Sequence, residues 1–279
     1  MEVPSVYGST GFIGDVFCNT YPSVRISREQ REPETKSILN FISTTHNYHV
    51  LDDSTADIET NLLVLMQMLI AAKKTYGSDF IFNHVSSWFV YGEALLPATE
   101  ASECKPKGLY SLTKKMSEDL LINYCETFDI EWRILRLANV LGISDEGVSA
   151  RKNATQFLLK KIISNEDIPL YYQGKFLREF IDVRDCVRAI NLVLHKGNVN
   201  SIYNIGNGDG IEFIRVIKYA MEYTKSKSRL VDFKQTEFHE QAQVKSFYMS
   251  TKRLESLGYF PKYFIEDTLE WIIDYYKHG

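Results

Sequence analysis

Hydrophobic and polar positions alternate along the first half of the chain between two kinds of segment. Short apolar runs predict strands at residues 23–27, 37–44, 79–87 and 130–142. Longer stretches with helical periodicity lie between them at 57–77, ending at Gly77, and at 109–129. A first strand before Gly8 must be short or begin after Pro4, because proline cannot donate to a strand ladder. This alternation of strands and helices predicts a parallel sheet covered by helices.

After Gly142 the pattern becomes mixed. The polar stretch 144–153 predicts a loop. Further helices are predicted at 154–165, 184–197 and 263–279. Short strands are predicted at 168–174 and 178–183, and 201–210 predicts a strand that ends in a turn. We interpret this part as a smaller lobe that packs on the first. No linker separates the two parts, so the cleft between them is the expected ligand site.

Composition excludes several classes of function for the 279 residues. A net charge of -4 gives no general attraction to nucleic acid or to an anionic membrane. No apolar run reaches the roughly 20 residues of a transmembrane helix, and the N-terminus has no signal-peptide pattern. The four cysteines are scattered without a CxxC pair: Cys18, Cys104, Cys125 and Cys186. We therefore expect no metal site, no disulfide and a reducing cytoplasm.

A glycine-rich turn, "GSTGFIG", follows the first predicted strand at residues 8–14. Gly8, Gly11 and Gly14 would let the backbone turn tightly and approach a pyrophosphate, which the start of the next helix can bind. The same turn taken alone is equally compatible with an ordinary loop. Its position at the opening of the first β-α unit favours a dinucleotide site, to which Thr10, Phe12 and Ile13 would also contribute.

The end of the second predicted strand bears on the choice of dinucleotide. A site for NAD would place Asp or Glu there to bind the ribose 2'-hydroxyl. This chain has Ser27 and Arg28 instead, a hydroxyl and a guanidinium that suit a 2'-phosphate. The prediction therefore favours NADP slightly over NAD. The alternative is that Arg28 is a solvated charge on a loop.

Three residues form a candidate catalytic group. Tyr110 and Lys114 lie four residues apart, on one face of the predicted helix. An ammonium near a phenol lowers the phenol pKa, so that the tyrosine could act as acid or base near neutral pH. Ser87, at the end of the preceding strand, could bind the same substrate oxygen. A tyrosine and lysine at this spacing alone are usually a solvated helix face.

Taken together, these motifs resemble the extended short-chain dehydrogenase/reductase family, of the NAD-dependent epimerase/dehydratase type. The resemblance covers nearly the whole chain and rests on "GSTGFIG" (8–14), "SSWFVYG" (86–92), "YSLTKKMSE" (110–118), "RLANVLG" (136–142) and "YNIGNGDG" (203–210). It implies a Rossmann-type doubly wound parallel sheet, mainly residues 1–142, and a smaller mixed α/β substrate-binding lobe, mainly residues 143–279. Segments within about 178–206 would return to the Rossmann sheet.

The resemblance also assigns residues. It implies that Asn61, together with Tyr110 and Lys114, binds the cofactor, that Asn139 contacts a nucleotide-sugar substrate, and that Arg178 grips its diphosphate. Arg178 in a structural ion pair is the alternative. Trp88 is either a wall of the substrate pocket or a packing residue. The two long helices, 57–77 and 109–129, would form a dimer interface, or would only cover the sheet.

Departures from the family pattern limit which of the family's reactions we expect this chain to catalyse. The family's 4,6-dehydratases carry Asp-Glu after the catalytic hydroxyl residue, and its 3,5-epimerase/reductases carry a Cys two places past the serine. Here the residues are Trp88 and Phe89, which favours simple hydride transfer at a sugar carbon. We expect a NAD(P)-dependent nucleotide-sugar epimerase, with 4-epimerase first. A short segment between Arg28 and Ile38 leaves no room for an extra β-α unit and favours the alternative, an NADPH-dependent reductase of a nucleotide keto-sugar. A non-catalytic dinucleotide-binding homologue is the third hypothesis.

Overall fold

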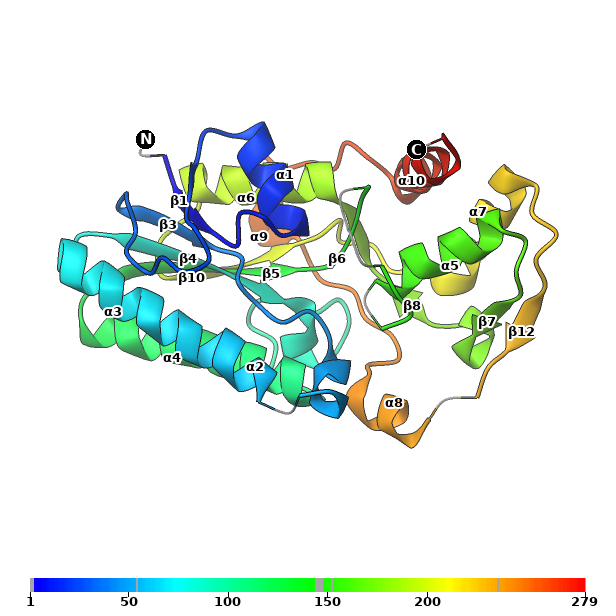
Figure 1. Ribbon diagram of the computed structural model, residues 1–279, viewed down its shortest axis with the longest axis horizontal. Helices are drawn as coiled ribbons and strands as arrows, with labels where there is room; N and C mark the ends of the chain where they lie inside the picture. The colour runs from blue at the N-terminus through cyan, green and yellow to red at the C-terminus, as the bar shows by residue number, and fades with distance from the viewer. Residues whose placement is uncertain (1–2, 54, 144–147, 152, 235, 279) are drawn as a thin grey trace.

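The computed structural model describes residues 3–53, 55–143, 148–151, 153–234 and 236–278. The stretch 144–153, predicted to be a loop, lies partly outside these residues. Figure 1 shows two parts side by side: a larger one built on a sheet, and a smaller one that carries the C-terminus.

The larger part contains six parallel strands in the order β10-β5-β4-β3-β1-β2. Their bounds are β1 Ser5–Tyr7, β2 Val24–Arg25, β3 Ser37–Asn40, β4 Ile81–Ser87, β5 Glu131–Leu137 and β10 Ser201–Ile205. The central strands β4 and β5 are buried over nearly their whole lengths, as expected for a parallel sheet covered on both faces. β1 begins directly after Pro4, as predicted. The predicted α/β fold of the Rossmann type is confirmed.

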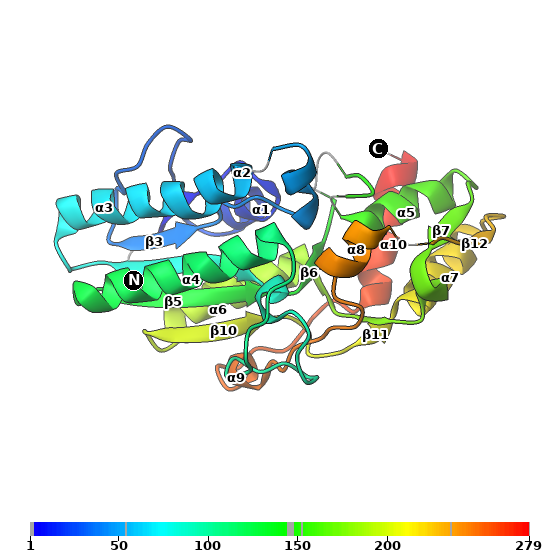
Figure 2. The same ribbon diagram turned by 90° about the horizontal axis from the view of Figure 1, so that it is seen from below.

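Helices cover both faces of this sheet (Figures 1 and 2). On one face lie α1 (Phe12–Thr20) and α6 (Val183–Lys196), and on the other lie α3 (Val64–Tyr76) and α4 (Leu109–Thr127). Each face has its own apolar core. β2 pairs with β1 on one side, and β3 pairs with β1 on the other side, so the strand order reverses at β1. Parallel sheets bind ligands at such a reversal, in the crevice beyond the carboxyl ends of the two strands, here β1 and β3.

The smaller part packs three helices into a third apolar core: α5 (Ala154–Ile163), α7 (Phe213–Thr224) and α10 (Ile265–His278). Three short strand pairs accompany them. β7 (Ile168–Leu170) pairs with β12 (Leu230–Asp232), β8 (Leu177–Arg178) with β11 (Ile211–Glu212), and β9 (Phe180–Asp182) with β6 (Asn139–Leu141). Short helices α8 (Glu237–Ala242) and α9 (Lys252–Glu255) lie on the chain that returns to the larger part.

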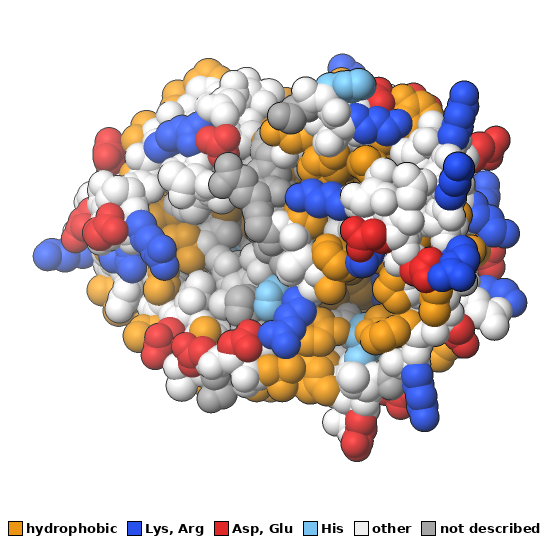
Figure 3. Space-filling view, turned by 45° about the vertical axis from the view of Figure 1, so that its right-hand side comes forward, with side chains coloured by type: hydrophobic (Ala, Val, Ile, Leu, Met, Phe, Trp, Pro, Cys, Tyr) orange, Lys and Arg blue, Asp and Glu red, His pale blue; other side chains and the backbone are white. Residues whose placement is uncertain are grey.

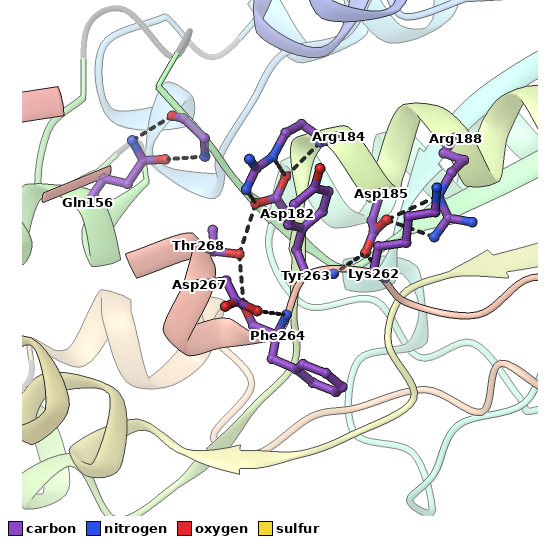
Figure 4. A network of polar contacts seen from close by, with 11 residues as sticks. Gln156, Asp182, Arg184, Asp185, Arg188, Lys262, Tyr263, Phe264, Asp267 and Thr268 are labelled. Atoms are coloured by element: carbon purple, nitrogen blue, oxygen red, sulfur yellow. Dashed lines mark hydrogen bonds and ion pairs between the residues drawn. The ribbon is translucent and has the colours of Figure 1, made fainter. Parts of the chain in front are cut away.

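A network of buried carboxylates joins the two parts (Figure 4). Asp182 accepts from the backbone N–H of Arg184 at the start of α6 and from the hydroxyl of Thr268 on α10. Asp185, fully buried, accepts the backbone N–H groups of Lys262 and Tyr263 through one oxygen. These bonds hold α10 against α6 and fix the end of β9.

Several predicted elements differ from the observed ones. The strand predicted over 168–174 ends at Leu170, and Tyr171–Gly174 form a 3-10 helix, η4. The helix predicted over 57–77 begins as α2 (Ala56–Ile58), passes through a π-helical turn, η2 (Glu59–Leu63), and continues as α3, which Gly77 ends as predicted with a positive φ of 67°. The strand predicted over 130–142 is split. β5 stays in the sheet up to Leu137, and β6 then leaves it to pair with β9 in the smaller part.

Candidate active site

A cavity of about 670 Å³ lies at the carboxyl edge of the sheet, between the two parts. The glycine turn, the ends of β3, β4 and β5, and the start of α4 form its inner side. Segments of the smaller part form its outer side. Figure 3 shows the hollow on this face, bordered mostly by hydrophobic and uncharged side chains with a few Lys and Arg side chains at its edge. The described residues that line the cavity include no Asp, Glu or Cys.

The glycine turn has the close packing that a dinucleotide site requires. Gly8 has a φ of 73°, and a Cβ on Gly14 would lie 2.2 Å from the carbonyl oxygen of Gly8, so a larger residue cannot stand at Gly14. α1 begins at Phe12, and its N-cap Gly11 offers no side-chain hydrogen bond to the first N–H groups. Those groups, at the positive end of the helix dipole, fit a pyrophosphate.

The other predicted cofactor residues on this side differ in exposure and in whether they line the cavity. Gly11, Phe12, Ile13 and Gly14 line the cavity, whereas Thr10 is exposed at the tip of the turn and does not. Ser27 and Arg28 follow β2, are exposed, and lie outside the cavity lining. Residues 26–36, all of them described, contain no helix or strand, as the short spacing predicted. Any contact of Ser27 and Arg28 with a cofactor stays a prediction.

Ser87 and Tyr110 come together inside the cavity, at the end of β4 and in the first turn of α4. Burial raises the pKa of the Tyr110 phenol, and the neighbouring hydroxyls of Ser87 and Ser43 oppose that rise. Ser43, just past β3, was not predicted. Its position near the carboxyl end of a strand, next to the glycine turn in the sheet order, was the available signal.

Lys114 is 1% exposed and also lines the cavity, one turn after Tyr110. Its Nζ donates to the carbonyl oxygen of Val85 at 2.8 Å. Burial lowers the pKa of Lys114 to about 8, against a smaller upward effect of Glu118. The expected lowering of the Tyr110 pKa by Lys114 is not what this arrangement gives, because burial dominates at Tyr110 and the ammonium is directed to Val85.

Asn61 does not line the cavity but supports one of its walls. It lies in the π-helical turn η2 and is 2% exposed. Its amide oxygen accepts from the backbone N–H of Thr44 and from the hydroxyl of Ser43, and its amide nitrogen donates to the hydroxyls of Thr44 and Thr113. Its visible effect is to hold the Ser43–Thr44 segment. The predicted contact with the cofactor stays a prediction.

The predicted substrate residues Trp88, Asn139 and Arg178 also line the cavity. The indole Nε1 of Trp88 donates to the amide oxygen of Asn139 at 3.3 Å, and Asn139 Nδ2 donates to the carbonyl oxygen of Glu179. Trp88 is 3% exposed and stacks between Phe89 and Phe247, with ring centroids 4.0 Å and 4.6 Å away. It is therefore both a packing residue and a part of the wall.

Arg178 lies over two aromatic rings and is tied to the backbone. Its guanidinium is 4.8 Å from the ring centroid of Phe176 and 5.6 Å from that of Trp88. It donates to the carbonyl oxygens of Leu177, Lys245 and Val244, which takes up three of its five N–H groups. Burial lowers its pKa to about 10. The structure shows no partner carboxylate, so the alternative of an ion pair is not what the described residues form.

An aromatic group at the outer end of the cavity was missed by the sequence analysis. His239 of α8 stacks on Tyr171 with ring centroids 4.3 Å apart, and its Nδ1 lies 2.5 Å from the hydroxyl of Tyr48. Tyr48 belongs to the larger part, in the 3-10 helix η1 (Asn47–Leu51), so this contact joins the two parts across the cavity. These residues are far apart in the sequence and no local pattern connects them.

Comparison with known proteins assigns the fold and the site to a family. Residues 30–206, more than half of the chain, match the family described as "NAD dependent epimerase/dehydratase family". The chain belongs to this family. The match begins after the glycine turn, so the turn itself rests on the geometry described above. Within the described residues, no group of His, Cys, Asp and Glu could hold a metal ion, and no helix could cross a membrane.

Two proteins are moderately similar to this chain in sequence. The low-salt glycan biosynthesis protein Agl12 of Haloferax volcanii is 27% identical over 241 residues, 86% of this chain and 74% of that protein. A trifunctional UDP-glucose 4,6-dehydratase/UDP-4-keto-6-deoxy-D-glucose 3,5-epimerase/UDP-4-keto-L-rhamnose-reductase of Arabidopsis thaliana is 27% identical over 249 residues. That match covers 87% of this chain but only 36% of the plant protein.

The fold is also seen in a solved structure. UDP-glucose 4-epimerase of Thermotoga maritima with UDP-glucose superimposes with a TM-score of 0.88, at 18% identity, over 99% of both chains. At this identity the likeness shows that the fold, including the smaller part, is the same. The predicted family and fold are thus confirmed.

Proposed function

We propose that this protein is a NAD(P)-dependent nucleotide-sugar epimerase that acts by hydride transfer at a sugar carbon, with C4 as the first candidate. One observation carries the proposal. The Tyr110 hydroxyl lies with Ser87, Ser43 and Lys114 in a cavity whose described lining contains hydroxyls and a buried cation but no carboxylate or thiol. Family membership supports the same class of reaction.

Each residue has a defined part in this reaction. When bound, the nicotinamide of NAD(P) takes up a hydride from the sugar carbon and can return it. Ser87 holds the sugar oxygen by a hydrogen bond, and Tyr110 moves the proton of that oxygen. Lys114 supplies a positive charge beside the site. The glycine turn and the start of α1 hold the pyrophosphate. For 4-epimerisation the keto sugar must turn over in the cavity before the hydride returns.

Two other reactions of the family need proton-transfer groups next to the serine, where this chain has none. Elimination of water across two carbons needs a carboxyl acid and base near the serine, and inversion through a carbanion needs an acid and a base on opposite faces of the sugar. The positions after Ser87 hold Trp88 and Phe89, which stack on one another and cannot exchange protons. This is why hydride transfer alone is preferred, although relatives named for dehydration are similar in sequence.

A reductase of a nucleotide keto-sugar, using NADPH, is the second candidate. It is favoured by the absence of a helix or strand in residues 26–36, which leaves the adenine side of the sheet open, and by Arg28 as a residue for a 2'-phosphate. The catalytic group would be the same. The two candidates differ in whether the cofactor is retained and recycled or is consumed.

The test is turnover by the purified protein and by Tyr110→Phe. The protein is first denatured to identify any retained NAD or NADP. It is then incubated with UDP-, dTDP-, GDP- and CDP-sugars, and products are separated by chromatography. Tyr110→Phe should reduce turnover by about 10²–10⁴-fold, since it removes the proton-transfer group. Tyr124→Phe, on the same helix but outside the cavity lining, is the matched control and should keep full activity.

The products decide between the candidates. A 4-epimer formed without net oxidation of cofactor establishes the epimerase, and stoichiometric loss of NADPH with a keto-sugar establishes the reductase. If the protein binds the dinucleotide but turns over no nucleotide sugar, the third hypothesis, a non-catalytic binding homologue, replaces both. Equal rates for Tyr110→Phe and the unmodified protein would remove Tyr110 from the mechanism.

The proposal includes a homodimer in the cytoplasm. Large apolar side chains are about half exposed on α3 and α4 and in the turn before α3: Leu63, Ile70, Leu112 and Met116. Such a patch on two adjacent helices suits a four-helix contact with a second copy. The four cysteines are free thiols, as a reducing compartment would keep them. Gel filtration with light scattering tests the dimer: a monomer at micromolar concentration would refute it.

A further inference from the structure

His84 lies directly behind the catalytic lysine and is used by none of the steps above. It is on β4, 1% exposed, and does not line the cavity. Its Nε2 is 3.4 Å from Lys114 Nζ and 3.0 Å from the hydroxyl of Ser117, and its Nδ1 is 3.2 Å from Asn40 Nδ2. Nε2 of a buried imidazole in this position presents to Lys114 either a lone pair or an N–H group. A lone pair would accept from the ammonium and stabilise its charge, whereas an N–H group would not.

The hydrogen bonds of Asn40 decide which tautomer is present. Asn40 Oδ1 accepts from the backbone N–H of Ile42 at 2.9 Å. That bond fixes the amide, since the reverse orientation would set an NH2 group against a backbone N–H. Asn40 Nδ2 therefore donates to His84 Nδ1, which must be the unprotonated nitrogen. The proton of the neutral imidazole is on Nε2.

The hydrogen bonds on the Nε2 side of the His84 ring indicate the same tautomer. The hydroxyl of Ser117 donates to the carbonyl oxygen of Lys114 at 2.7 Å, so its oxygen is free to accept from His84 Nε2. The bonds form one directed chain from Ile42 through Asn40, His84 and Ser117 to the carbonyl of Lys114. Protonation of Nδ1 would break this chain, and burial together with Lys114 lowers the pKa of His84 well below its usual value.

We infer that His84, which Asn40 holds as the Nε2–H tautomer, is a positioning residue. It gives Lys114 no hydrogen-bond acceptor and so makes the ammonium form of Lys114 less stable. The Nε2–H group gives the ammonium no acceptor, so Val85 O is its one hydrogen-bond acceptor within the described residues. This N–H is donated to Ser117, and its positive end lies near the ammonium, 3.4 Å between the two nitrogens. His84 thus favours loss of a proton from Lys114 and leaves its remaining N–H groups for partners in the cavity.

Other charges near Lys114 act in the opposite sense or are compensated. Glu118, one turn further along α4, favours the ammonium. It is itself paired with Arg136 of β5 at 2.7 Å, and both are nearly fully buried. The Ser86 hydroxyl also donates to Glu118. Among the described residues, no carboxylate is therefore paired with Lys114 alone, and the tautomer of His84 directly affects the charge on Lys114.

The inference deepens the proposed function but is tested without any substrate. In the full-length protein labelled with [15N]histidine, the two ring nitrogens of His84 should show the Nε2–H tautomer, unchanged between pH 6 and 9. The His84 signals are assigned by their loss in His84→Gln. The Nδ1–H tautomer or an imidazolium in this range overturns the inference, whatever the protein turns over.

The second measurement follows Lys114 by the 13Cε shift of labelled lysine, assigned with Lys114→Met. In the unmodified protein it should titrate near pH 8. His84→Gln can turn an amide oxygen toward Lys114, and this acceptor should raise the midpoint by about one unit, the size of one neutral hydrogen bond. An unchanged midpoint would reduce His84 to a packing residue.

A matched control separates this effect from a general loss of stability. Asn83, the preceding residue on β4, is fully buried and bonds to Ile38 and Arg133, away from Lys114. Asn83→Ala should destabilise the fold and leave the Lys114 midpoint unchanged. If a substrate is found, the alkaline limb of kcat/KM should move upward by about one unit in His84→Gln. If none is found, the two nuclear magnetic resonance measurements still decide the inference.

Discussion

The indole nitrogen of Trp88 donates a hydrogen bond to the amide oxygen of Asn139, so two residues predicted separately as substrate contacts are partners of one another. The bond joins the end of β4 to the start of β6, the point where the chain leaves the sheet for the smaller part. It fixes which way the Asn139 amide faces. The oxygen points to Trp88 and the nitrogen to Glu179, which limits what the amide can offer a ligand.

Replacing Trp88 by Phe should therefore affect both stability and substrate binding. The change removes the N–H to Asn139 and part of a ring that is 3% exposed, so the free energy of unfolding should fall by about 1–3 kcal/mol. Freed from Trp88, the Asn139 amide should bind substrate less well, and KM should rise. Trp132→Phe is the control: Trp132 is similarly buried but lies outside the cavity lining. It should lower stability and leave KM unchanged, and equal KM values for both variants would contradict this.

Gly14→Ala tests the glycine turn. A Cβ at this position would lie 2.2 Å from the carbonyl oxygen of Gly8, which is backbone and cannot move aside cheaply. Dinucleotide affinity, measured by calorimetry, should fall by at least about 100-fold, or the protein should fail to fold. At Gly11 the corresponding distance is 3.4 Å, an ordinary contact. Gly11→Ala should thus fold normally and bind clearly better than Gly14→Ala. The same loss in both variants would mean that close packing of the turn is not the cause.

The sequence could predict the sheet and the placement of the candidate catalytic group because both depend on local patterns. Apolar runs of strand length alternate with helical periods, and a parallel sheet is the arrangement that buries such runs on both faces. Ser87 ends one strand and Tyr110 begins the helix that follows, so any fold of this class brings them to the same edge. Gly77 ended the predicted helix because a positive φ there favours glycine.

What the sequence analysis missed depends on contacts between distant segments. The hydrogen bonds of Asn61 to Ser43 and Thr44 were not predicted, because they depend on a π-helical turn that no local sequence pattern indicates. The bonds of Arg178 to carbonyl groups at Val244 and Lys245 join residues more than sixty positions apart. α7 was not predicted at all, although its apolar face packs on α5 and α10.

Arg28→Ala tests the preference for NADP. If the guanidinium pairs with the 2'-phosphate, its removal should weaken NADPH binding by about 10- to 100-fold, corresponding to roughly 1.5–3 kcal/mol for hydrogen bonds to a charged group. NADH lacks this phosphate and serves as the internal control, with affinity unchanged. Fluorescence titration with both cofactors gives the ratio. Because Arg28 is exposed, the variant should fold normally. An unchanged NADPH affinity would remove the basis for preferring NADP.

Lys114 imposes a cost on folding that its removal should reveal. Burial lowers the pKa of Lys114 from 10.5 to about 8. Below pH 8 the folded protein buries an ammonium. Between pH 8 and 10.5 the folded chain has released this proton while the unfolded chain still holds it, so the contribution to stability rises with pH. Lys114→Met removes the charge and keeps most of the volume. At pH 7 it should raise the free energy of unfolding by about 1–3 kcal/mol while abolishing turnover.

Urea unfolding of the unmodified protein and of Lys114→Met at several pH values measures this effect. The difference between them should be largest at pH 7 and should shrink as the pH passes 8, because the unmodified protein then loses the buried charge. Lys115→Met is the control. Lys115 is only partly buried and pairs with Asp119 on the helix surface, so its replacement should change stability by no more than about 0.5 kcal/mol at any pH. A Lys114→Met protein less stable than the unmodified one would show that the ammonium stabilises the fold. Lys114 would then act as a structural cation.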